Sequence, residues 1–273
     1  MPYQDCFVDN NGVNIHYEVE EGAVESPVIV FVHGMGMSTK DWRNAGYPEK
    51  LCNEFKVVLI DSRGFGQSDK PKDPAVYGRA QKVSDVTAVL DDLGVDKAYY
   101  WGFSMGSSIG WAVGMLAPER FHGLVLGAYP VLSPDVPEID RVRWEARAKL
   151  MRLGMDVYVA AMEMDQGPLP EESKARLLSN DKDAYAAQQI ANLEWGAPDE
   201  DIVNMTLPAL VYSGTDDDYP MPRNHALTKR SASLAPNARF LPLEGHTHMS
   251  AFMAADLMIP HVREFIAMVE DTR

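Results

Sequence analysis

The sequence has 273 residues, of which 46% are hydrophobic, enough for one large domain or for a domain with an insertion. Its net charge is −15, from 40 acidic and 25 basic residues, which argues against nucleic acid and anionic membrane surfaces as partners. The sequence shows no apolar run of membrane-spanning length and no secretion signal, and two cysteines are too few for a disulfide framework. A reduced, cytoplasmic protein is therefore expected.

The first strands are predicted to form a hairpin. Residues 7–9 and 13–19 have strand character, and Asn10, Asn11 and Gly12 between them are a turn signal. Beyond the hairpin, short apolar runs alternate with segments of helical pattern, which indicates a mainly parallel sheet covered on both faces. The further strands are predicted at 28–32, 57–60, 98–101, 124–126, 209–212 and 240–243, and the helices at 40–54, 79–93, 105–117, 223–233 and 253–270.

Residues 133–204 interrupt this alternation. The segment is charged, contains methionines and has a helical pattern without a convincing strand. Because active sites of open α/β sheets lie at the carboxyl ends of the strands, a helical insertion is expected to cover that end. The predicted organisation is a core of residues 1–132 and 205–273, with a helical cap of residues 133–204.

A Gly-Phe-Ser-Met-Gly pentapeptide occupies residues 102–106, between a predicted strand and a predicted helix. This pattern predicts a tight strand-to-helix turn, in which the flanking glycines leave room for the backbone and Ser104 projects its hydroxyl above the sheet edge. The backbone N–H of Met105, at the start of the helix, is then placed to bind an oxyanion.

A serine nucleophile needs a base to take its proton and a third group to orient that base. Three carboxylates, at residues 216–218, stand just past the next-to-last predicted strand, and His246 and His248 follow the last strand. The order along the chain is therefore serine, aspartate, histidine, as in α/β-hydrolases.

Four motifs make the sequence resemble an α/β-hydrolase fold protein along nearly its whole length. They are His-Gly-Met-Gly at 33–36, Asp-Ser-Arg-Gly-Phe-Gly-Gln-Ser-Asp at 61–69, the pentapeptide at 102–106 and the histidine-bearing loop after the last strand. The second is similar to the family's D-x-R-G-x-G-x-S turn. The resemblance implies a mainly parallel, eight-stranded α/β-hydrolase sheet flanked by helices, with a helical cap inserted after the sixth strand. It also implies that Met35 supplies the second oxyanion N–H, while His33 orders the oxyanion loop.

The resemblance assigns the acid and the base by position. The family usually places its acid three residues after the strand-end glycine, which maps to Asp217, and its usual spacing from the start of the last strand reaches His248. Asp216 stays open as the acid. Asp135 also stays open, because some relatives place their acid after the sixth strand, whereas Asp218 is less expected. His246 stays open as the base.

The chemistry implied by these residues is acyl transfer without a metal or cofactor. His248 removes the proton of Ser104 as the serine attacks an acyl carbonyl, and Asp217 stabilises the imidazolium. The N–H groups of Met35 and Met105 bind the tetrahedral oxyanion. Serine at the elbow argues against the haloalkane dehalogenase and epoxide hydrolase branches, which resemble this fold but use a carboxylate nucleophile.

The cap is expected to provide the substrate wall. Trp144, Met151 and Met155 fall on one helical face, with Trp195 further along, and such side chains adapt to irregular apolar ligands. Packing of the cap on the core is the alternative for each of them. Arginines lie in the same predicted helix at 141, 143, 147 and 152. A solvated face paired with neighbouring carboxylates is favoured for these arginines over contact with a carboxylate substrate.

The predicted function is a serine hydrolase acting on a small-molecule ester, lactone or similar acyl compound. The same elbow is similar to that of cofactor-free perhydrolases and haloperoxidases, and hydrolysis of a carbon–carbon bond is a further alternative. A ligand receptor or signalling partner built on this fold is the non-enzymatic alternative, since a fold does not fix a function.

Overall fold

The computed structural model describes all residues except 1–2, 21, 23–25, 219–221 and 273. The described residues form one eight-stranded sheet in the order β1-β2-β4-β3-β5-β6-β7-β8. The hairpin strands β1 and β2 and the β2–β4 pair are antiparallel, and all other neighbours are parallel. The strands are β1 Gln4–Asp9, β2 Asn14–Glu20, β3 Val28–Val32, β4 Lys56–Ile60, β5 Ala98–Phe103, β6 Phe121–Gly127, β7 Ala209–Gly214 and β8 Ala238–Leu243. The mainly parallel eight-stranded sheet is the one predicted.

Alternate residues of the central strands pack on opposite faces of the sheet. In β3, Val30 and Val32 join one hydrophobic cluster, whereas Ile29 and Phe31 join the other. Strand β5 divides in the same way, because side chains two residues apart in a strand point to the same face. Nearly all of these side chains are fully buried, which explains why the strands read as continuous apolar runs in the sequence.

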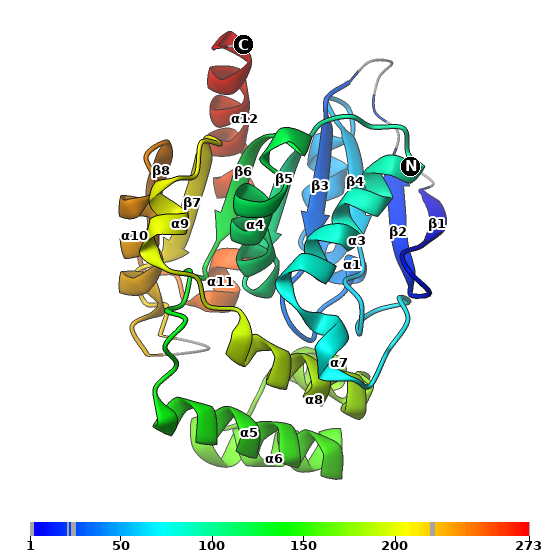
Figure 1. The fold of residues 1–273 in the computed structure, drawn as a ribbon, viewed down its shortest axis with the longest axis vertical. Helices are drawn as coiled ribbons and strands as arrows, with labels where there is room; N and C mark the ends of the chain where they lie inside the picture. The colour runs from blue at the N-terminus through cyan, green and yellow to red at the C-terminus, as the bar shows by residue number, and fades with distance from the viewer. Residues whose placement is uncertain (1–2, 21, 23–25, 219–221, 273) are drawn as a thin grey trace.

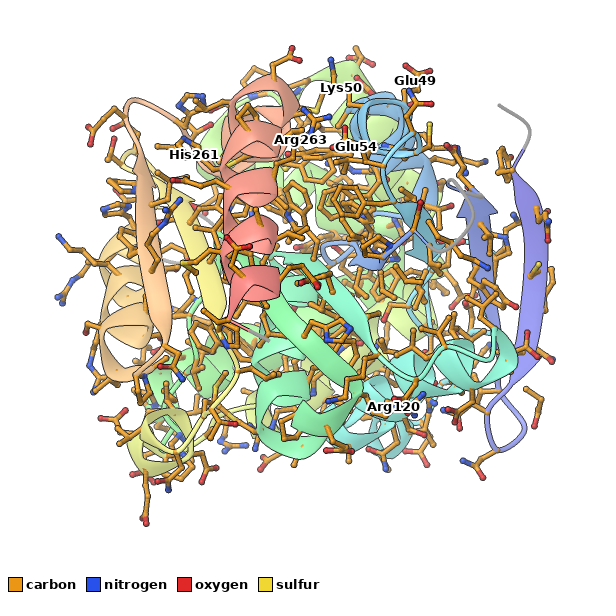
Figure 2. All side chains as sticks on the ribbon, turned by 90° about the horizontal axis from the view of Figure 1, so that it is seen from above. Glu49, Lys50, Glu54, Arg120, His261 and Arg263 are labelled. Carbon is orange, nitrogen blue, oxygen red and sulfur yellow. The ribbon has the colours of Figure 1, made fainter. Side chains whose placement is uncertain are left out.

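Helices cover both faces of the sheet (Figure 1). Helices α3 (Arg79–Asp92) and α4 (Met105–Leu116) lie on one face, and α12 (Ala255–Asp271) lies on the other. Figure 2 shows α12 beside α2 (Tyr47–Leu51), where Arg263 donates hydrogen bonds to the Glu54 carboxylate and to the carbonyl of Lys50. The remaining core elements are α1 Thr39–Asn44, η1 Pro74–Tyr77, η2 Pro118–Arg120, α10 Asn224–Leu234 and α11 His248–Phe252.

One of the predicted helices is broken into two. The helix predicted at 40–54 is divided into α1 and α2 at Gly46, whose φ of 78° separates the first helix from the second, which begins at Tyr47 with Pro48 in its first turn. The error arises where one apolar period runs across a local break in the backbone. The helix predicted at 253–270 corresponds to α12, Ala255–Asp271.

Between β6 and β7 the chain forms helices, in the part of the cap that the structure describes. They are α5 Glu138–Leu153, α6 Met155–Gln166, α7 Glu171–Leu178, α8 Lys182–Ala191, η3 Asn192–Glu194 and α9 Asp199–Val203. Figure 1 shows α5, α6, α7 and α8 below the sheet, at the end where the parallel strands terminate in their carboxyl ends. Among the described residues, no helix is both long and apolar enough to span a membrane.

Candidate active site

Ser104 occupies a strained turn between β5 and α4. Its φ of 54° and ψ of −115° lie in a region that L-residues rarely adopt, and such strain is concentrated at functional sites. The flanking glycines allow the turn. A Cβ on Gly102 would lie 2.2 Å from the carbonyl oxygen of Gly106, and one on Gly106 would lie 2.0 Å from the carbonyl oxygen of Val32. The pentapeptide is thus glycine-flanked because the start of α4 packs directly on the ends of β3 and β5.

Met35 and Met105, whose backbone N–H groups are the expected oxyanion donors, line the same cavity as Ser104. Met105 is the first residue of α4, and a Cβ built on Gly34 would lie 3.2 Å from the Ser104 Cβ, so the loop that carries Met35 reaches the serine. Among the described residues, neither N–H donates a hydrogen bond in the turn, loop and cap network. Two free donors beside a serine hydroxyl are the arrangement that stabilises a tetrahedral oxyanion.

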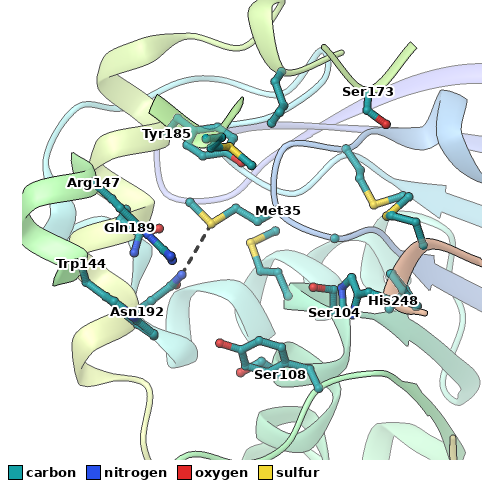
Figure 3. A pocket seen from close by; sticks show the side chains of 18 of the residues that line it. Met35, Ser104, Ser108, Trp144, Arg147, Ser173, Tyr185, Gln189, Asn192 and His248 are labelled. Atoms are coloured by element: carbon teal, nitrogen blue, oxygen red, sulfur yellow. Dashed lines mark hydrogen bonds between the residues drawn. The ribbon is translucent and has the colours of Figure 1, made fainter. Parts of the chain in front are cut away.

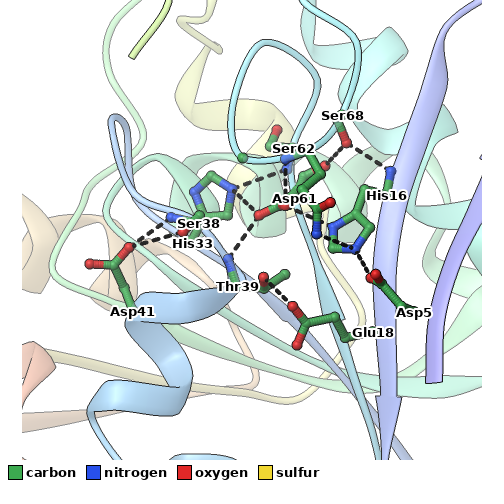
Figure 4. A network of polar contacts seen from close by, with 12 residues as sticks. Asp5, His16, Glu18, His33, Ser38, Thr39, Asp41, Asp61, Ser62 and Ser68 are labelled. Carbon is green, nitrogen blue, oxygen red and sulfur yellow. Dashed lines mark hydrogen bonds and ion pairs between the residues drawn. The ribbon is translucent and has the colours of Figure 1, made fainter. Parts of the chain in front are cut away.

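The loop with Met35 is held by a buried histidine (Figure 4). His33 Nε2 accepts a hydrogen bond from the Ser62 N–H at 3.1 Å, so the ring proton sits on Nδ1, which donates to the Gly34 carbonyl at 2.7 Å. Burial lowers the pKa of His33, although the nearby Asp61 carboxylate opposes this effect. His33 is therefore a neutral ring that fixes the loop.

Asp61 anchors the next layer of this network. Its carboxylate accepts hydrogen bonds from the N–H groups of Thr39 and Gln67, both at 2.8 Å, and pairs with His16 Nδ1 at 2.7 Å. A Cβ on Gly66 would lie 2.0 Å from the Asp61 carboxyl carbon, which explains the glycine at that position. The carboxylate therefore ties the turn at 61–69 to the start of α1, next to the oxyanion loop.

Replacement of Asp61 by asparagine is expected to lower the free energy of unfolding by about 3 kcal/mol, since it leaves buried donors unpaired. Burial alone would raise the pKa of this carboxyl, but His16, His33 and two backbone N–H groups lower it overall. Because its folded-state pKa is lowered, the ionised Asp61 stabilises the fold at pH values above the unfolded-state pKa of about 3.9. This stabilisation is lost as the pH falls through the folded-state pKa.

Urea unfolding measures both effects. The difference in the free energy of unfolding between wild type and Asp61→Asn is expected to persist from pH 7 to pH 5 and to narrow below about pH 4. Asp271→Asn is the matched control, because its carboxylate is exposed at the end of α12 and its loss is expected to change stability by less than about 0.5 kcal/mol. A difference that widens with acid would contradict the assignment.

Asp217 and His248 meet beyond the ends of β7 and β8. The carboxylate oxygens of Asp217 lie 3.1 and 3.2 Å from His248 Nδ1, and both side chains are buried. The two loops approach because Gly214 ends β7, where a Cβ would lie 1.9 Å from the carbonyl oxygen of His246. That carbonyl accepts a hydrogen bond from the Asp216 N–H at 3.0 Å. The glycine thus lets the acid-bearing loop reach the base-bearing loop.

The alternative acid and base positions have other partners. His246 is half-buried and its Nδ1 pairs with the Glu244 carbonyl at 3.0 Å. The Asp218 carboxylate accepts the Arg223 N–H, and Asp135 is an exposed residue whose N–H bonds to the Ser133 hydroxyl. The Asp216 carboxylate accepts the hydroxyl of Thr215 at 3.3 Å. The geometry therefore favours Asp217 and His248, whose roles stay predictions.

A cavity of about 860 Å³ lies between the sheet and the cap. Figure 3 shows Ser104 and His248 next to each other at one side of it, with Met35 nearby. Methionines contribute much of the lining on the serine side, namely Met35, Met37, Met105 and Met249. The arrangement can hold an apolar acyl group against a buried serine, histidine and carboxylate.

The cap residues expected in the pocket fall into two pairs. Trp144 and Trp195 line the cavity, and the Trp195 indole also donates a hydrogen bond to the Tyr77 carbonyl at 3.0 Å. Met151 and Met155 are buried in a hydrophobic cluster and are not among the residues that line the cavity. For these two methionines the structure favours the packing alternative over substrate contact.

One cluster of potential metal ligands occurs among the described residues. Asp5, His16 and Glu18 place ligand atoms within 4.8 Å of one another. Each is already engaged: His16 lies between Asp5 and Asp61, and the Glu18 carboxylate accepts from Thr39 and pairs with Arg43. The cluster is accounted for as a polar network that supports the edge of the sheet.

The sequence reasoning missed two groups around the site. His16 carries no partner pattern in the sequence, yet it completes the Asp61 network. In the 61–69 turn, Arg63 forms a buried two-point ion pair with Asp85 of α3, and Lys82 donates to the Ser62 hydroxyl and the Arg63 carbonyl. A charged pair 22 residues apart has no local signal, but the D-x-R-G turn could have prompted a search for a buried acid.

The chain is similar to known proteins in sequence. Residues 27–145 match the model of the family described as alpha/beta hydrolase fold. Over 251 residues the chain is 25% identical to a putative 2-succinyl-6-hydroxy-2,4-cyclohexadiene-1-carboxylate synthase of Bacillus subtilis, a match that covers 85% of this chain and 89% of that protein. Over 101 residues it is 34% identical to epoxide hydrolase B of Mycobacterium tuberculosis, which covers 37% of this chain and only 28% of that enzyme.

The fold is similar to solved structures over nearly the whole chain. One is the enol-lactonase from Burkholderia xenovorans, with a TM-score of 0.77 and 26% sequence identity, where the match covers 96% of this chain and 100% of the other. Because the match covers nearly the whole chain, the sheet, the elbow and the loops that follow β7 and β8 belong to an architecture that the two proteins share.

Proposed function

The chain is a member of the α/β-hydrolase fold superfamily, and on that premise we propose that it is a serine hydrolase of small acyl compounds. The observation that carries the proposal is that Ser104, on a strained elbow, and His248 line one cavity, and that His248 Nδ1 pairs with the buried Asp217 carboxylate. The proposed substrates are carboxylic esters, lactones or similar acyl compounds.

The proposed reaction has two halves. His248 takes the proton of the Ser104 hydroxyl as its oxygen attacks the acyl carbonyl, and Asp217 holds the imidazole through Nδ1 and stabilises its charged form. The tetrahedral intermediate collapses, the imidazolium protonates the leaving oxygen, and an acyl-enzyme remains. Water activated by His248 then releases the acid and restores the serine.

The oxyanion of each tetrahedral intermediate is assigned to the N–H groups of Met35 and Met105. Loss of one such donor typically costs about 100- to 1,000-fold in rate. The donors are backbone groups, so their position depends on the glycines and on the His33–Asp61 network described above. This network is assigned to positioning the loop and not to proton transfer, because both ring nitrogens of His33 are engaged, with the Ser62 N–H and the Gly34 carbonyl.

Other chemistries of the fold are alternatives to ester or lactone cleavage. Epoxide hydrolases of this fold attack with a carboxylate, whereas position 104 is serine in this chain, and the likeness to epoxide hydrolase B covers only part of that enzyme. Perhydrolysis and carbon–carbon bond hydrolysis use a serine elbow. The methionine-lined acyl side of the cavity favours hydrolysis of an apolar acyl group.

A substrate panel tests the proposal. Purified protein is assayed with p-nitrophenyl esters and lactones of graded chain length, and in parallel for peroxide-dependent halogenation. We expect ester or lactone hydrolysis with saturation kinetics and no requirement for peroxide. Halogenation without ester hydrolysis, or no turnover of any acyl compound by the folded protein, would overturn the proposed function.

A further inference from the structure

The cavity has two chemically different sides. Next to Ser104 the lining is rich in methionine, whereas the cap side carries a guanidinium and two carboxamides, from Arg147, Gln189 and Asn192. Figure 3 shows these three side chains together, across the cavity from Ser104 and His248. Arg147 belongs to α5 and Gln189 to α8, two helices that pack against each other.

Arg147 is the cavity arginine that the described carboxylates leave unpaired. Three arginines line the cavity in the part of the chain that the structure describes. Arg143 pairs with Asp140 at 3.5 Å, and Arg176 pairs with Asp41 at 3.1 Å. Among the described residues, no hydrogen bond or ion pair reaches the Arg147 guanidinium, which is half-buried. A half-buried guanidinium without an acceptor has a planar fork of donors available to a ligand carboxylate.

Gln189 adds a buried polar group to the same place. Its side chain is 7% exposed and lines the cavity, yet it has no hydrogen-bond partner among the described residues. Buried carboxamides in folded proteins are ordinarily hydrogen-bonded, so an unpartnered one that faces a cavity indicates a ligand partner. Packing of α8 against its neighbours does not explain it, because Ala184, Ala187 and Ala191 already make the apolar contact with η1.

Asn192 orients its amide toward the same space. Its Oδ1 accepts from Gln188 Nε2 at 2.6 Å, which turns the NH₂ group toward the Met35 sulfur at 3.7 Å. A thioether is a weak acceptor, so this donor is poorly satisfied. The contact also shows that the polar cluster borders Met35, the residue whose N–H is assigned to the oxyanion.

Acidic residues also line the cavity, and they lie on other segments. Asp216 and Asp218 belong to the loop after β7, where Asp216 accepts the Thr215 hydroxyl and Asp218 accepts the Arg223 N–H. Asp165 lies near the end of α6, and no ion pair joins it to Arg147. The donors of Arg147, Gln189 and Asn192 therefore form a cluster of their own.

We propose that Arg147, Gln189 and Asn192 form a subsite for a carboxylate group of the substrate, so that the enzyme prefers acyl compounds that also carry an acid. The proposal rests on the proposed function, and it narrows the substrate class to carboxylate-bearing esters and lactones. The acyl carbonyl then sits at Ser104 while the distant carboxylate binds under the cap.

Two matched esters test the subsite. Mono-p-nitrophenyl glutarate and p-nitrophenyl valerate differ in whether the acyl chain ends in a carboxylate or a methyl group. The wild type is expected to show the higher kcat/KM for the glutarate ester. Arg147→Ala is expected to lower that value by about 10- to 100-fold, chiefly through KM, while the valerate value changes by less than about threefold.

Control variants separate local contact from overall charge. Arg152→Ala removes the same charge from the exposed end of α5, outside the cavity, and is expected to leave the ratio of the two esters unchanged. Arg147→Lys keeps the charge without the planar fork and is expected to give an intermediate loss. If the ratio of kcat/KM for the two esters is the same in wild type and Arg147→Ala, the subsite is overturned, whereas the proposed serine hydrolase activity is unaffected.

A binding measurement is independent of turnover. Monomethyl glutarate is expected to raise the Tm of Ser104→Ala, and to raise that of Ser104→Ala/Arg147→Ala much less. If the wild type hydrolyses neither ester but this Arg147-dependent shift appears, the subsite stands and the proposed function fails. No shift in either variant would count against the subsite.

Discussion

Replacement of Ser104 by alanine is expected to lower kcat/KM for any acyl substrate by roughly 10⁴- to 10⁶-fold. The hydroxyl is the only group at the elbow that can form the acyl bond, and His248 has no other proton to remove there. The fold is expected to persist, although alanine must keep the positive φ of 54°. Far-UV circular dichroism and the Tm of the variant check that the loss is chemical.

A fluorophosphonate probe gives the same prediction without a known substrate. The wild type is expected to be labelled covalently and Ser104→Ala to remain unlabelled, because the probe is attacked by an activated serine. Ser107→Ala is the matched control: it removes a hydroxyl from the same helix, where Ser107 bonds to the Tyr129 carbonyl. It is expected to be labelled like the wild type. A folded wild type that resists labelling would contradict the acyl-enzyme.

Most of the sheet could be predicted because its signals are local. The strands β3 to β7 are nearly continuous apolar runs, buried on both faces, and each is followed by a turn or a helix start. The elbow could also be predicted, since the glycines at 102 and 106 report close backbone contacts that any other side chain would prevent. Sequence reasoning succeeds where one local rule decides the structure.

The cap could not be predicted to the same depth. Periodicity places Trp144, Met151 and Met155 on one helical face, but it does not tell a face buried against the sheet from a face that borders a cavity. The tertiary arrangement decides: Trp144 lines the cavity, and the two methionines pack into the core. Gln189 carried no signal at all, because a glutamine is notable only once it is buried without a partner.

The choice between two histidines, which the sequence leaves open, gives the second large expected effect. His248→Ala is expected to lower kcat/KM by at least about 10³-fold, because the general base and its link to Asp217 are lost together. His246→Ala is expected to stay within about threefold of the wild type, because its ring is outside the cavity lining and bonds only to the nearby Glu244 carbonyl among the contacts described. The two substituted positions are two residues apart after β8, so each variant is a control for local structural damage in the other.

The expected difference between the two variants depends on the local contacts of His246 and His248. The carbonyl of His246, which alanine retains, receives the Asp216 N–H and so keeps the loops after β7 and β8 together. His248 is the first residue of α11, where the Thr247 and Ser250 side chains cap the helix, and its ring packs on Phe103 with centroids 4.9 Å apart. Steady-state rates at several pH values measure the outcome. A severe loss in His246→Ala with activity retained in His248→Ala would reverse the assignment of the base, because only the residue that takes the Ser104 proton can have so large an effect on an otherwise intact site.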